Sequence, residues 1–316
     1  MTTLYDIVDS QKYVHEMGYQ AITTRALDEN FGVRRIELQD LKPGLIPPCS
    51  TVISRLKLRT LDRLLGVVST CIPEGCKVFV YELDTWCNFV KGEPLRDSYE
   101  RITRSLSRHH WDQDPTDPDA ELPVFLVASH FWAAKCRERL IKAVFCRPWL
   151  HPDQCRDPIP WADRKYDVAF FGTIHPSRAA FFEGLEKAGI KVHVEQMMGY
   201  QQYLDALRDT RITVRTEPVR GEYDFPITGV NALYFRDVEA ASQGCFSVRT
   251  FDTEGVHWVG CNHRSFKDVE GAAREIRSIL HDEPNRDEMS LIHVNDCKLH
   301  STWDSVAKVI KDSVKQ

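Results

Sequence analysis

The chain has 316 residues, of which 42% are hydrophobic and 28% charged, and a formal net charge of −5. These values are ordinary for a soluble globular protein, and the length allows two domains with separate cores. No apolar run approaches the roughly 18 residues of a membrane-spanning helix, and no basic region followed by an apolar stretch opens the chain. Ten cysteines lie scattered among apolar neighbours, which favours reduced thiols and a cytoplasmic location.

The first half of the chain alternates short apolar runs with amphipathic stretches. Strands are predicted at 50–53, 77–83 and 124–127, and helices at 56–68, 99–109 and 132–141. The segment before Pro47 has a weak pattern, although a helix over 13–27 is compatible with it. Four prolines within 148–160 indicate a linker. We therefore expect an α/β domain over residues 1–150.

The second half begins with the clearest strand–helix–strand unit. Asp167-Val-Ala-Phe-Phe-Gly172 predicts a short buried strand and a turn, and a helix follows from Pro176 to Gly189. Further strands are predicted at 190–194, 212–214 and 246–248, with helices at 203–207 and 234–242. This order favours a parallel sheet with right-handed crossovers. In such sheets a ligand lies at the carboxyl ends of the strands, against helix N-termini that favour anions.

The two halves differ in charge. Residues 1–150 carry 20 Lys and Arg and 20 Asp and Glu, whereas the remainder carries 21 and 26. Arg101, Arg104 and Arg108 recur at spacings of three and four, so they share one face of a predicted helix. Such a face can contact the phosphates of a nucleic acid. The alternative is a solvated helix face without a partner.

Two α/β halves of similar size resemble the GT-B glycosyltransferases, in which two Rossmann-like domains face each other across a cleft. In the second half, Val168-Ala-Phe-Phe-Gly172-Thr and Arg236-Asp-Val-Glu239-Ala-Ala-Ser-Gln-Gly244 resemble the donor domain of spore-maturation-type and family 1 glycosyltransferases. The first half is similar more loosely, through Tyr81-Glu-Leu-Asp84-Thr-Trp and Ala128-Ser-His130-Phe-Trp. The resemblance covers roughly residues 50–314. The Gly-rich first loop of the family has no counterpart here.

The resemblance implies an acceptor-binding domain over 1–150. It also implies a nucleotide-sugar-binding domain over 151–316, with the C-terminal helix at 303–314. Glu239 matches the glutamate that the family uses for the donor ribose, since a carboxylate accepts from both hydroxyls. The alternative role of Glu239 is that of an acid near a helix N-terminus.

A nucleotide-sugar donor also brings a diphosphate. Arg236 could meet it with a bidentate contact, or form a surface ion pair instead. Gly172 and Thr173 would let the diphosphate approach backbone N–H groups, or form an ordinary turn. Arg178 and Arg215 are further candidates for the same charge.

An inverting reaction needs a base for the acceptor hydroxyl, whereas a retaining reaction needs none. Asp84, after the strand at 77–83, is the candidate base, or else a helix cap. His15, His130 and His151 are alternatives. No metal is expected, because GT-B enzymes do not generally need one and because the segment His257-Trp-Val-Gly-Cys261-Asn-His263 lacks a clear fourth ligand.

The function predicted is hexose transfer from UDP-glucose or a similar donor, with no other cofactor. Compact bacteriophage-type enzymes that glucosylate hydroxymethylated DNA bases share the GT-B architecture. A hydroxymethylated pyrimidine in double-stranded DNA is therefore the first choice of acceptor. A protein, a glycan and a small metabolite are alternatives. A non-catalytic module that binds a nucleotide or nucleic acid is the contrasting hypothesis.

Overall fold

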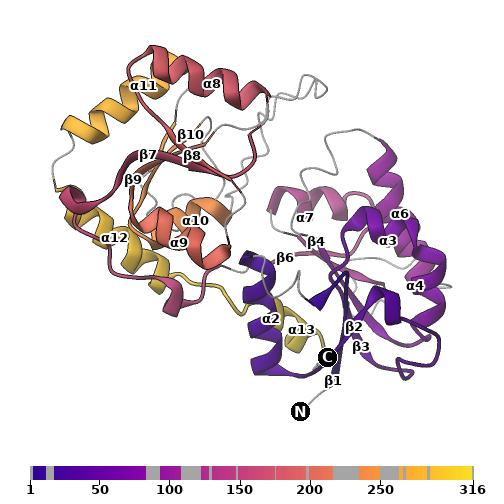
Figure 1. The fold of residues 1–316 in the computed structure, drawn as a ribbon. Coiled ribbons are helices and arrows are strands. Elements are labelled where there is room, and N and C mark those ends of the chain that lie inside the picture. Colours follow the sequence, from indigo (N-terminus) through magenta and orange to yellow (C-terminus); the bar gives the residue numbers. More distant parts are fainter. Residues whose placement is uncertain are drawn as a thin grey trace. The chain divides into compact units, whose positions relative to one another are not determined.

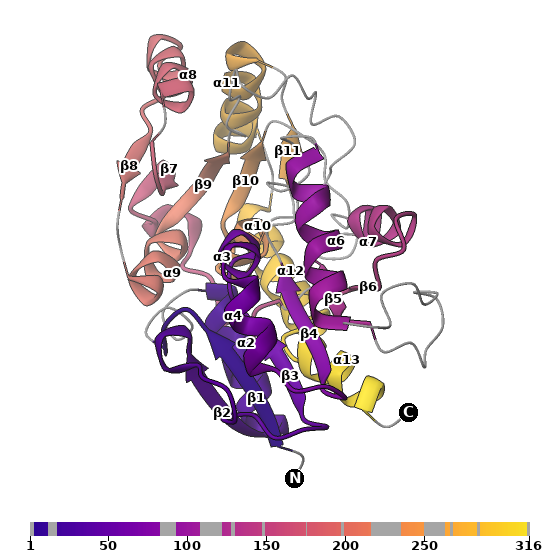
Figure 2. The ribbon, with the colours of Figure 1, turned by 90° about the vertical axis from the view of Figure 1, so that its right-hand side faces the viewer.

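The computed structural model describes residues 3–11, 18–82, 93–107, 122–127, 130–146, 149–174, 176–196, 199–215, 235–249, 263–265, 268–282 and 285–314. The chain divides into two compact units, Met1–Pro148 together with Trp303–Gln316, and Trp149–Thr302. Each unit is built on one parallel sheet with helices on both of its faces (Figures 1 and 2).

The first unit contains a six-stranded sheet in the order β2-β1-β3-β4-β5-β6, and every neighbouring pair is parallel. Its strands are β1 (Thr3–Val8), β2 (Gly32–Glu37), β3 (Thr51–Ser54), β4 (Lys77–Glu82), β5 (Val124–Val127) and β6 (Ala143–Phe145). Its helices are α2 (Gly18–Asn30), the 3-10 turn η1 (Leu38–Asp40), α3 (Leu58–Arg63), α4 (Leu65–Cys71), α6 (Glu93–Ser107), α7 (His130–Arg137) and α13 (Ser305–Val314). The core has two layers, one beneath α3, α4, α6 and α7 and the other beneath α2 and α13 (Figure 1).

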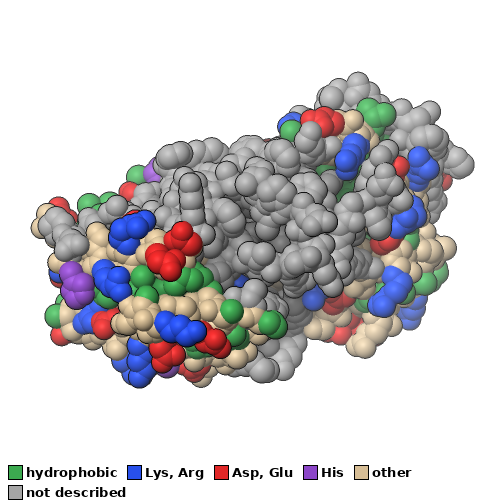
Figure 3. Space-filling model, turned by 90° about the horizontal axis from the view of Figure 1, so that it is seen from above, with side chains coloured by type: hydrophobic (Ala, Val, Ile, Leu, Met, Phe, Trp, Pro, Cys, Tyr) green, Lys and Arg blue, Asp and Glu red, His purple; other side chains and the backbone are tan. Residues whose placement is uncertain are grey.

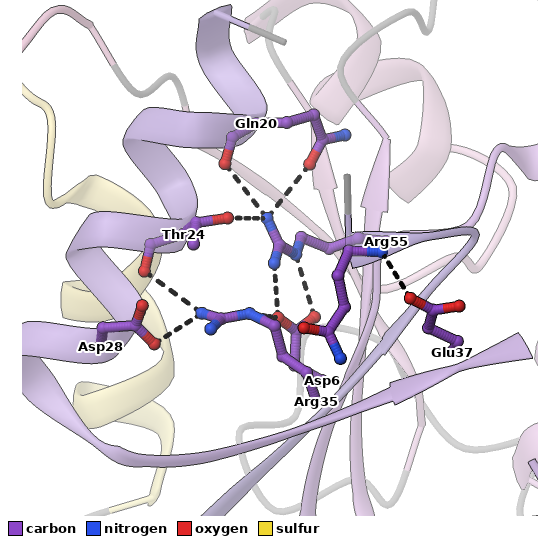
Figure 4. A network of polar contacts seen from close by, with 8 residues as sticks. Asp6, Gln20, Thr24, Asp28, Arg35, Glu37 and Arg55 are labelled. Atoms are coloured by element: carbon purple, nitrogen blue, oxygen red, sulfur yellow. Dashed lines mark hydrogen bonds and ion pairs between the residues drawn. The ribbon is translucent and has the colours of Figure 1, made fainter. Parts of the chain in front are cut away.

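Strand β1 holds a buried ion-pair network, which Figure 4 shows against helix α2. Asp6 is fully buried, and its carboxylate accepts two hydrogen bonds from the equally buried Arg55, at 2.9 and 2.5 Å. Arg35 from β2 donates to the same carboxylate at 3.1 Å. Arg55 also donates to the Thr24 hydroxyl at 2.9 Å, and Arg35 to Asp28 at 2.5 Å. The network therefore joins β1, β2 and the residue that follows β3 to α2.

The C-terminal helix belongs to the first unit, which corrects its expected place in the second domain. Buried Val306, Ala307 and Ile310 of α13 lie in the core layer that α2 also covers. The Lys311 ammonium donates to the Asn30 side chain of α2 at 2.6 Å. The apolar stripe of α13 predicts a packed helix, but the stripe alone does not say which sheet it packs on.

The second unit contains a five-stranded sheet in the order β11-β10-β9-β7-β8, again with parallel neighbours only. Its strands are β7 (Tyr166–Phe171), β8 (His193–Glu195), β9 (Thr210–Arg215), β10 (Phe246–Arg249) and β11 (His263–Ser265). Its helices are α8 (Pro176–Lys187), α9 (Tyr200–Arg208), α10 (Phe235–Ser242), α11 (Val269–Arg277) and α12 (Arg286–Leu299), with the short turns η2 (Pro152–Gln154), η3 (Trp161–Asp163) and η5 (Ser278–Asp282). Helices α8 and α11 cover one face, and α9, α10 and α12 the other (Figure 1).

Two further properties concern the described residues alone. None of their helices combines the length and the apolar character that crossing a bilayer requires. All eight of their cysteines are free thiols, and six of these are buried.

Candidate functional site

The strand order of the second unit reverses between β7 and β9. The chain passes from β7 to β8 on one side and then returns to β9 on the other side of β7. Ligands of open α/β sheets bind at this reversal of strand order. Gly172 follows β7 directly, and Arg215 is the last residue of β9. Arg249 ends β10 and is the register partner of Arg215.

Arg236, in the first turn of α10, reaches across to the end of β7. Its guanidinium donates to the Phe171 carbonyl at 3.0 Å. Gly172 has a φ of +146°, and a Cβ added there would lie 2.6 Å from the Arg236 Nη1 atom. The backbone conformation favours glycine, and a larger side chain would displace the Arg236 guanidinium. The structure thus brings together two residues that the sequence predicted as donor contacts, 64 positions apart.

Asp237 holds the two arginines that end β9 and β10. Its carboxylate is 1% exposed and accepts from Arg249 at 2.6 Å and from Arg215 at 3.1 Å. Arg249 is 3% exposed, whereas Arg215 is 15% exposed. Arg215 therefore has the better access to a ligand, and Asp237 fixes its direction.

Glu239 follows Arg236 by one helical turn and is 3% exposed. Burial raises the pKa of the Glu239 carboxyl to about 7, against the opposing effect of the Arg236 charge and of the Tyr200 and Tyr203 hydroxyls. Both tyrosines come from α9, which packs on α10. The Arg215 charge also lowers the pKa of this carboxyl.

The remaining predicted donor residues lie on the turn after β7. Thr173 is exposed, and its carbonyl accepts from Arg178 at 2.5 Å. The Arg178 guanidinium also lies 4.6 Å from the centre of the Phe170 ring. These contacts fix the turn that carries Gly172.

Of the predicted acceptor residues, Arg101 and Arg104 lie on α6 within the described chain. Arg101 forms a two-bond pair with Asp62 of α3, at 2.7 and 3.0 Å, and the hydrogen bond from Arg101 lowers the pKa of Asp62. Arg104 lies 3.8 Å from Glu100. On the face seen in Figure 3, basic and acidic side chains are interspersed over the described surface. The two arginines therefore sit among carboxylates.

Several other candidates lie outside the described residues. They are the candidate base Asp84, Arg108, His15, and His257 and Cys261 of the histidine- and cysteine-containing segment. His151 is described, and its ring accepts from the Asp153 backbone as a cap of the turn η2. Over the described ranges, no three or more metal-ligating side chains lie together.

Four residues beside the predicted ones were not expected in the site: Tyr200, Tyr203, Asp237 and Arg249. The sequence holds a weak signal for two of them. Arg249 ends a predicted strand just as Arg215 does, so in a parallel sheet both lie on one edge. The tyrosines follow each other at helical spacing, but their contact with Glu239 depends on how two helices pack.

We name Gly172, Tyr200, Tyr203, Arg215, Arg236, Asp237, Glu239 and Arg249 the carboxyl-edge cluster. It presents three guanidinium groups and two carboxylates, one of which takes up a proton near neutral pH. This balance favours a ligand with negative charge. A planar guanidinium suits phosphate oxygens, and a buried carboxylate suits a pair of hydroxyl donors.

No family model matches the sequence, and no curated protein matches it either. Solved structures with a similar fold do exist. AviGT4, a glycosyltransferase involved in avilamycin A biosynthesis, is 16% identical with a TM-score of 0.53, over 100% of this chain and 97% of its own. Anabaena Alr3699/HepE in complex with UDP is 10% identical, with a TM-score of 0.56 over the whole of both chains.

A third similar structure is an alpha-glucosyltransferase in complex with UDP-glucose and DNA containing an abasic site. It is 10% identical, with a TM-score of 0.58, over 100% of this chain and 99% of its own. At such identities the likeness concerns the fold. The predicted fold, two Rossmann-like domains as in GT-B glycosyltransferases, is confirmed.

Proposed function

We propose that this protein is a glycosyltransferase that moves a hexose from a nucleotide-diphosphate sugar, of the UDP-glucose type, to an acceptor hydroxyl. The observation that carries the proposal is the meeting of Gly172, Arg236 and Glu239 at the strand-order reversal of the second unit. In this proposal Arg236 binds the diphosphate and Glu239 binds the ribose. Similar structures that hold UDP or UDP-glucose support this assignment. The resemblance of the donor half to spore-maturation-type and family 1 enzymes belongs to the same proposal.

In this proposal the second unit binds the donor and the first unit the acceptor. The departing nucleoside diphosphate gains negative charge as the sugar bond breaks. Arg236, Arg215 and the N-terminal turn of α10 stabilise that charge, and binding both substrates in one geometry lowers the entropic part of the barrier. The arginines supply the positive charge that a metal ion supplies elsewhere, so the proposal includes no metal.

Donor binding is tested by thermal shift with UDP and UDP-glucose. A ligand present at 100 times its Kd should add about 2.7 kcal/mol to the free energy of unfolding. Glu239→Ala should remove most of this gain. Glu195→Gln is the matched control, because its side chain is 49% exposed at the same sheet edge but pairs with His193 instead. Equal UDP binding by wild type and Glu239→Ala, measured by calorimetry, would show the ribose assignment to be wrong.

For the acceptor, we propose a hydroxymethylated pyrimidine in double-stranded DNA. The similar glucosyltransferase structure that contains DNA favours this acceptor. A base that is stacked in a duplex must be flipped out before its hydroxymethyl group can reach a bound donor. Asp84 is the proposed base for an inverting reaction, and Arg101, Arg104 and Arg108 are the proposed phosphate contacts.

The acceptor is tested with one enzyme preparation on hydroxymethylated and on unmodified DNA. Sugar transfer to the modified DNA alone supports the proposal. Changing both Arg101 and Arg104 to Glu should weaken duplex binding at low salt and leave UDP-glucose binding unchanged. Transfer to a peptide, glycan or small metabolite, with none to DNA, would show the proposed DNA acceptor to be wrong. The proposal that the protein is a glycosyltransferase would then still hold. Donor binding without transfer or hydrolysis on any acceptor would favour a non-catalytic module.

A further inference from the structure

The surroundings of Glu239 disfavour the ionised form of its carboxyl group. The side chain is 3% exposed, and its neighbours Val238 and Ala240 are fully or almost fully buried. The charges that favour ionisation come from Arg236 on the same helix and Arg215 at the end of β9. Taking a carboxylate out of water disfavours its charged form, and here this effect exceeds the attraction of both cations.

Helix α9 adds two hydroxyl groups to this setting. Tyr200 and Tyr203 lie one helical turn apart, with ring centres 6.3 Å from each other. The Tyr203 ring packs edge-on against Phe171 of β7, at 6.1 Å. Both hydroxyls approach the Glu239 carboxylate and favour its ionised form. The tyrosine rings are thus fixed between α10 and the end of β7.

The two hydroxyls remain protonated, so each can donate a hydrogen bond to a carboxylate. Burial and the Glu239 charge raise the pKa of Tyr200 and of Tyr203 well above its usual value. Within the described part of the chain, the buried Tyr200 Oη has no hydrogen-bond partner of ordinary geometry. The Tyr200 hydroxyl is therefore an unused hydrogen-bond donor near the Glu239 carboxylate.

Among the described residues that other elements place beside α10 or Tyr200, His293 and Cys155 are both neutral. Helix α12 packs on α10 through Cys297, whose thiol donates to the Val238 carbonyl at 3.8 Å. His293 of α12 is buried against Phe246, and burial lowers the pKa of His293 to about 4, so it is neutral. Cys155, beside Tyr200, is neutral as well, because burial raises the pKa of its thiol to about 11.

We propose that Tyr200 and Tyr203 are positioning residues that hold Glu239 for the donor ribose and set the pH range in which it binds the donor. The inference rests on the proposed function. Two ribose hydroxyls that donate to one carboxylate require its ionised form. Binding of the donor to the protonated form therefore releases the Glu239 proton to the solvent. Donor affinity then rises with pH, because only the ionised fraction of the free protein is competent to bind.

The structure gives the size of the effect. A carboxyl group with a pKa of about 7 is about one-tenth ionised at pH 6 and about nine-tenths ionised at pH 8. The Kd of UDP-glucose should therefore be about tenfold weaker at pH 6 than at pH 8. Each Tyr→Phe change removes a hydroxyl that favours the charged form, so the midpoint of this dependence should move to higher pH.

Isothermal titration calorimetry with UDP-glucose tests the proposal. The sugar diphosphate, unlike UDP, has no second phosphate ionisation near neutral pH, so any proton exchanged belongs to the protein. Titrations at pH 6 in two buffers of different ionisation enthalpy count the protons. Wild type should release close to one proton, and Glu239→Gln none. Tyr203→Phe and Tyr200→Phe should retain binding and shift the midpoint upward.

Tyr166→Phe is the matched control, since Tyr166 lies in the same unit but its ring stacks on His193 at 4.1 Å. Its midpoint should equal that of wild type. Binding of UDP-glucose without pH dependence, with proton uptake, or with the same midpoint in both α9 variants would overturn the inference and leave the proposed function intact. Failure of wild type to bind UDP-glucose at any pH would overturn both.

Discussion

Replacing Asp6 by Asn tests the buried network that joins the first sheet to α2. Asparagine keeps the volume of the side chain and removes only its charge. Arg55 is fully buried, and its Nε and Nη2 atoms both donate to Asp6. Breaking a buried pair by removing one partner costs about 3–5 kcal/mol, because it leaves an uncompensated charge in the interior. This is a large part of the roughly 5–15 kcal/mol by which proteins are stable.

Urea unfolding followed by hydrogen exchange resolves the two units and gives the free energy of each. Asp6→Asn should destabilise β1, α2 and the rest of the first unit, with little change in the second. Glu29→Gln is the control on the same helix, because the Arg25–Glu29 pair is exposed on both sides. An exposed ion pair at this spacing contributes only about 0.3–0.5 kcal/mol to the free energy of unfolding.

A second variant separates charge from packing. Replacing both residues by apolar side chains, as in Asp6→Leu with Arg55→Met, removes the uncompensated charge and should recover a large part of the lost stability. Equal effects of Asp6→Asn and Glu29→Gln would refute the reasoning, since the buried pair would then behave as a solvated one.

Two glycine substitutions follow from the same geometry. Gly172→Ala should weaken UDP-glucose binding about 10- to 100-fold in calorimetry, because the new Cβ meets the Arg236 guanidinium at 2.6 Å and displaces a charge-assisted contact. Gly244→Ala should lower the free energy of unfolding by about 1–3 kcal/mol more than Gly189→Ala in urea titrations. Both glycines have positive φ, but only the Cβ at Gly244 meets another atom, the Pro158 Cβ at 2.6 Å.

Strands β7, β9 and β10 of the second unit could be predicted because each contains a short run of apolar residues, whereas the polar strand β11 (His263–Ser265) was not predicted. Strand β1 could not be predicted. Its apolar residues Leu4, Ile7 and Val8 are interrupted by Asp6, which by itself argues against a central strand. The charge is tolerated only because Arg35 and Arg55, 29 and 49 positions later, meet it in space.

The residues of the candidate site likewise divide into those that the sequence could predict and those that it could not. Gly172, Arg236 and Glu239 each occupy a position with a local meaning, a turn or the start of a helix, so their residue types point to a ligand. Tyr200 and Asp237 matter because of what they touch in other elements. Their contacts depend on the order of strands in the sheet and the packing of α9 on α10, which local patterns do not determine.

The two sheets share the arrangement of their first three strands. An arginine lies at the end of the third strand in both units, but its surroundings differ between them. In each, the first strand lies between the second and the third. The third strand of the first unit, β3, is followed directly by Arg55, whose guanidinium is fully buried and bonded to Asp6 and α2. The third strand of the second unit, β9, ends at Arg215, which donates to Asp237 and has 15% of its side chain exposed. A cation saturated by its own protein has no hydrogen bonds left for a phosphate. An arginine whose side chain is partly open to solvent can reach a ligand, and Arg236 lies beside the same carboxyl edge. This contrast supports the proposal that the second unit binds the diphosphate of the donor.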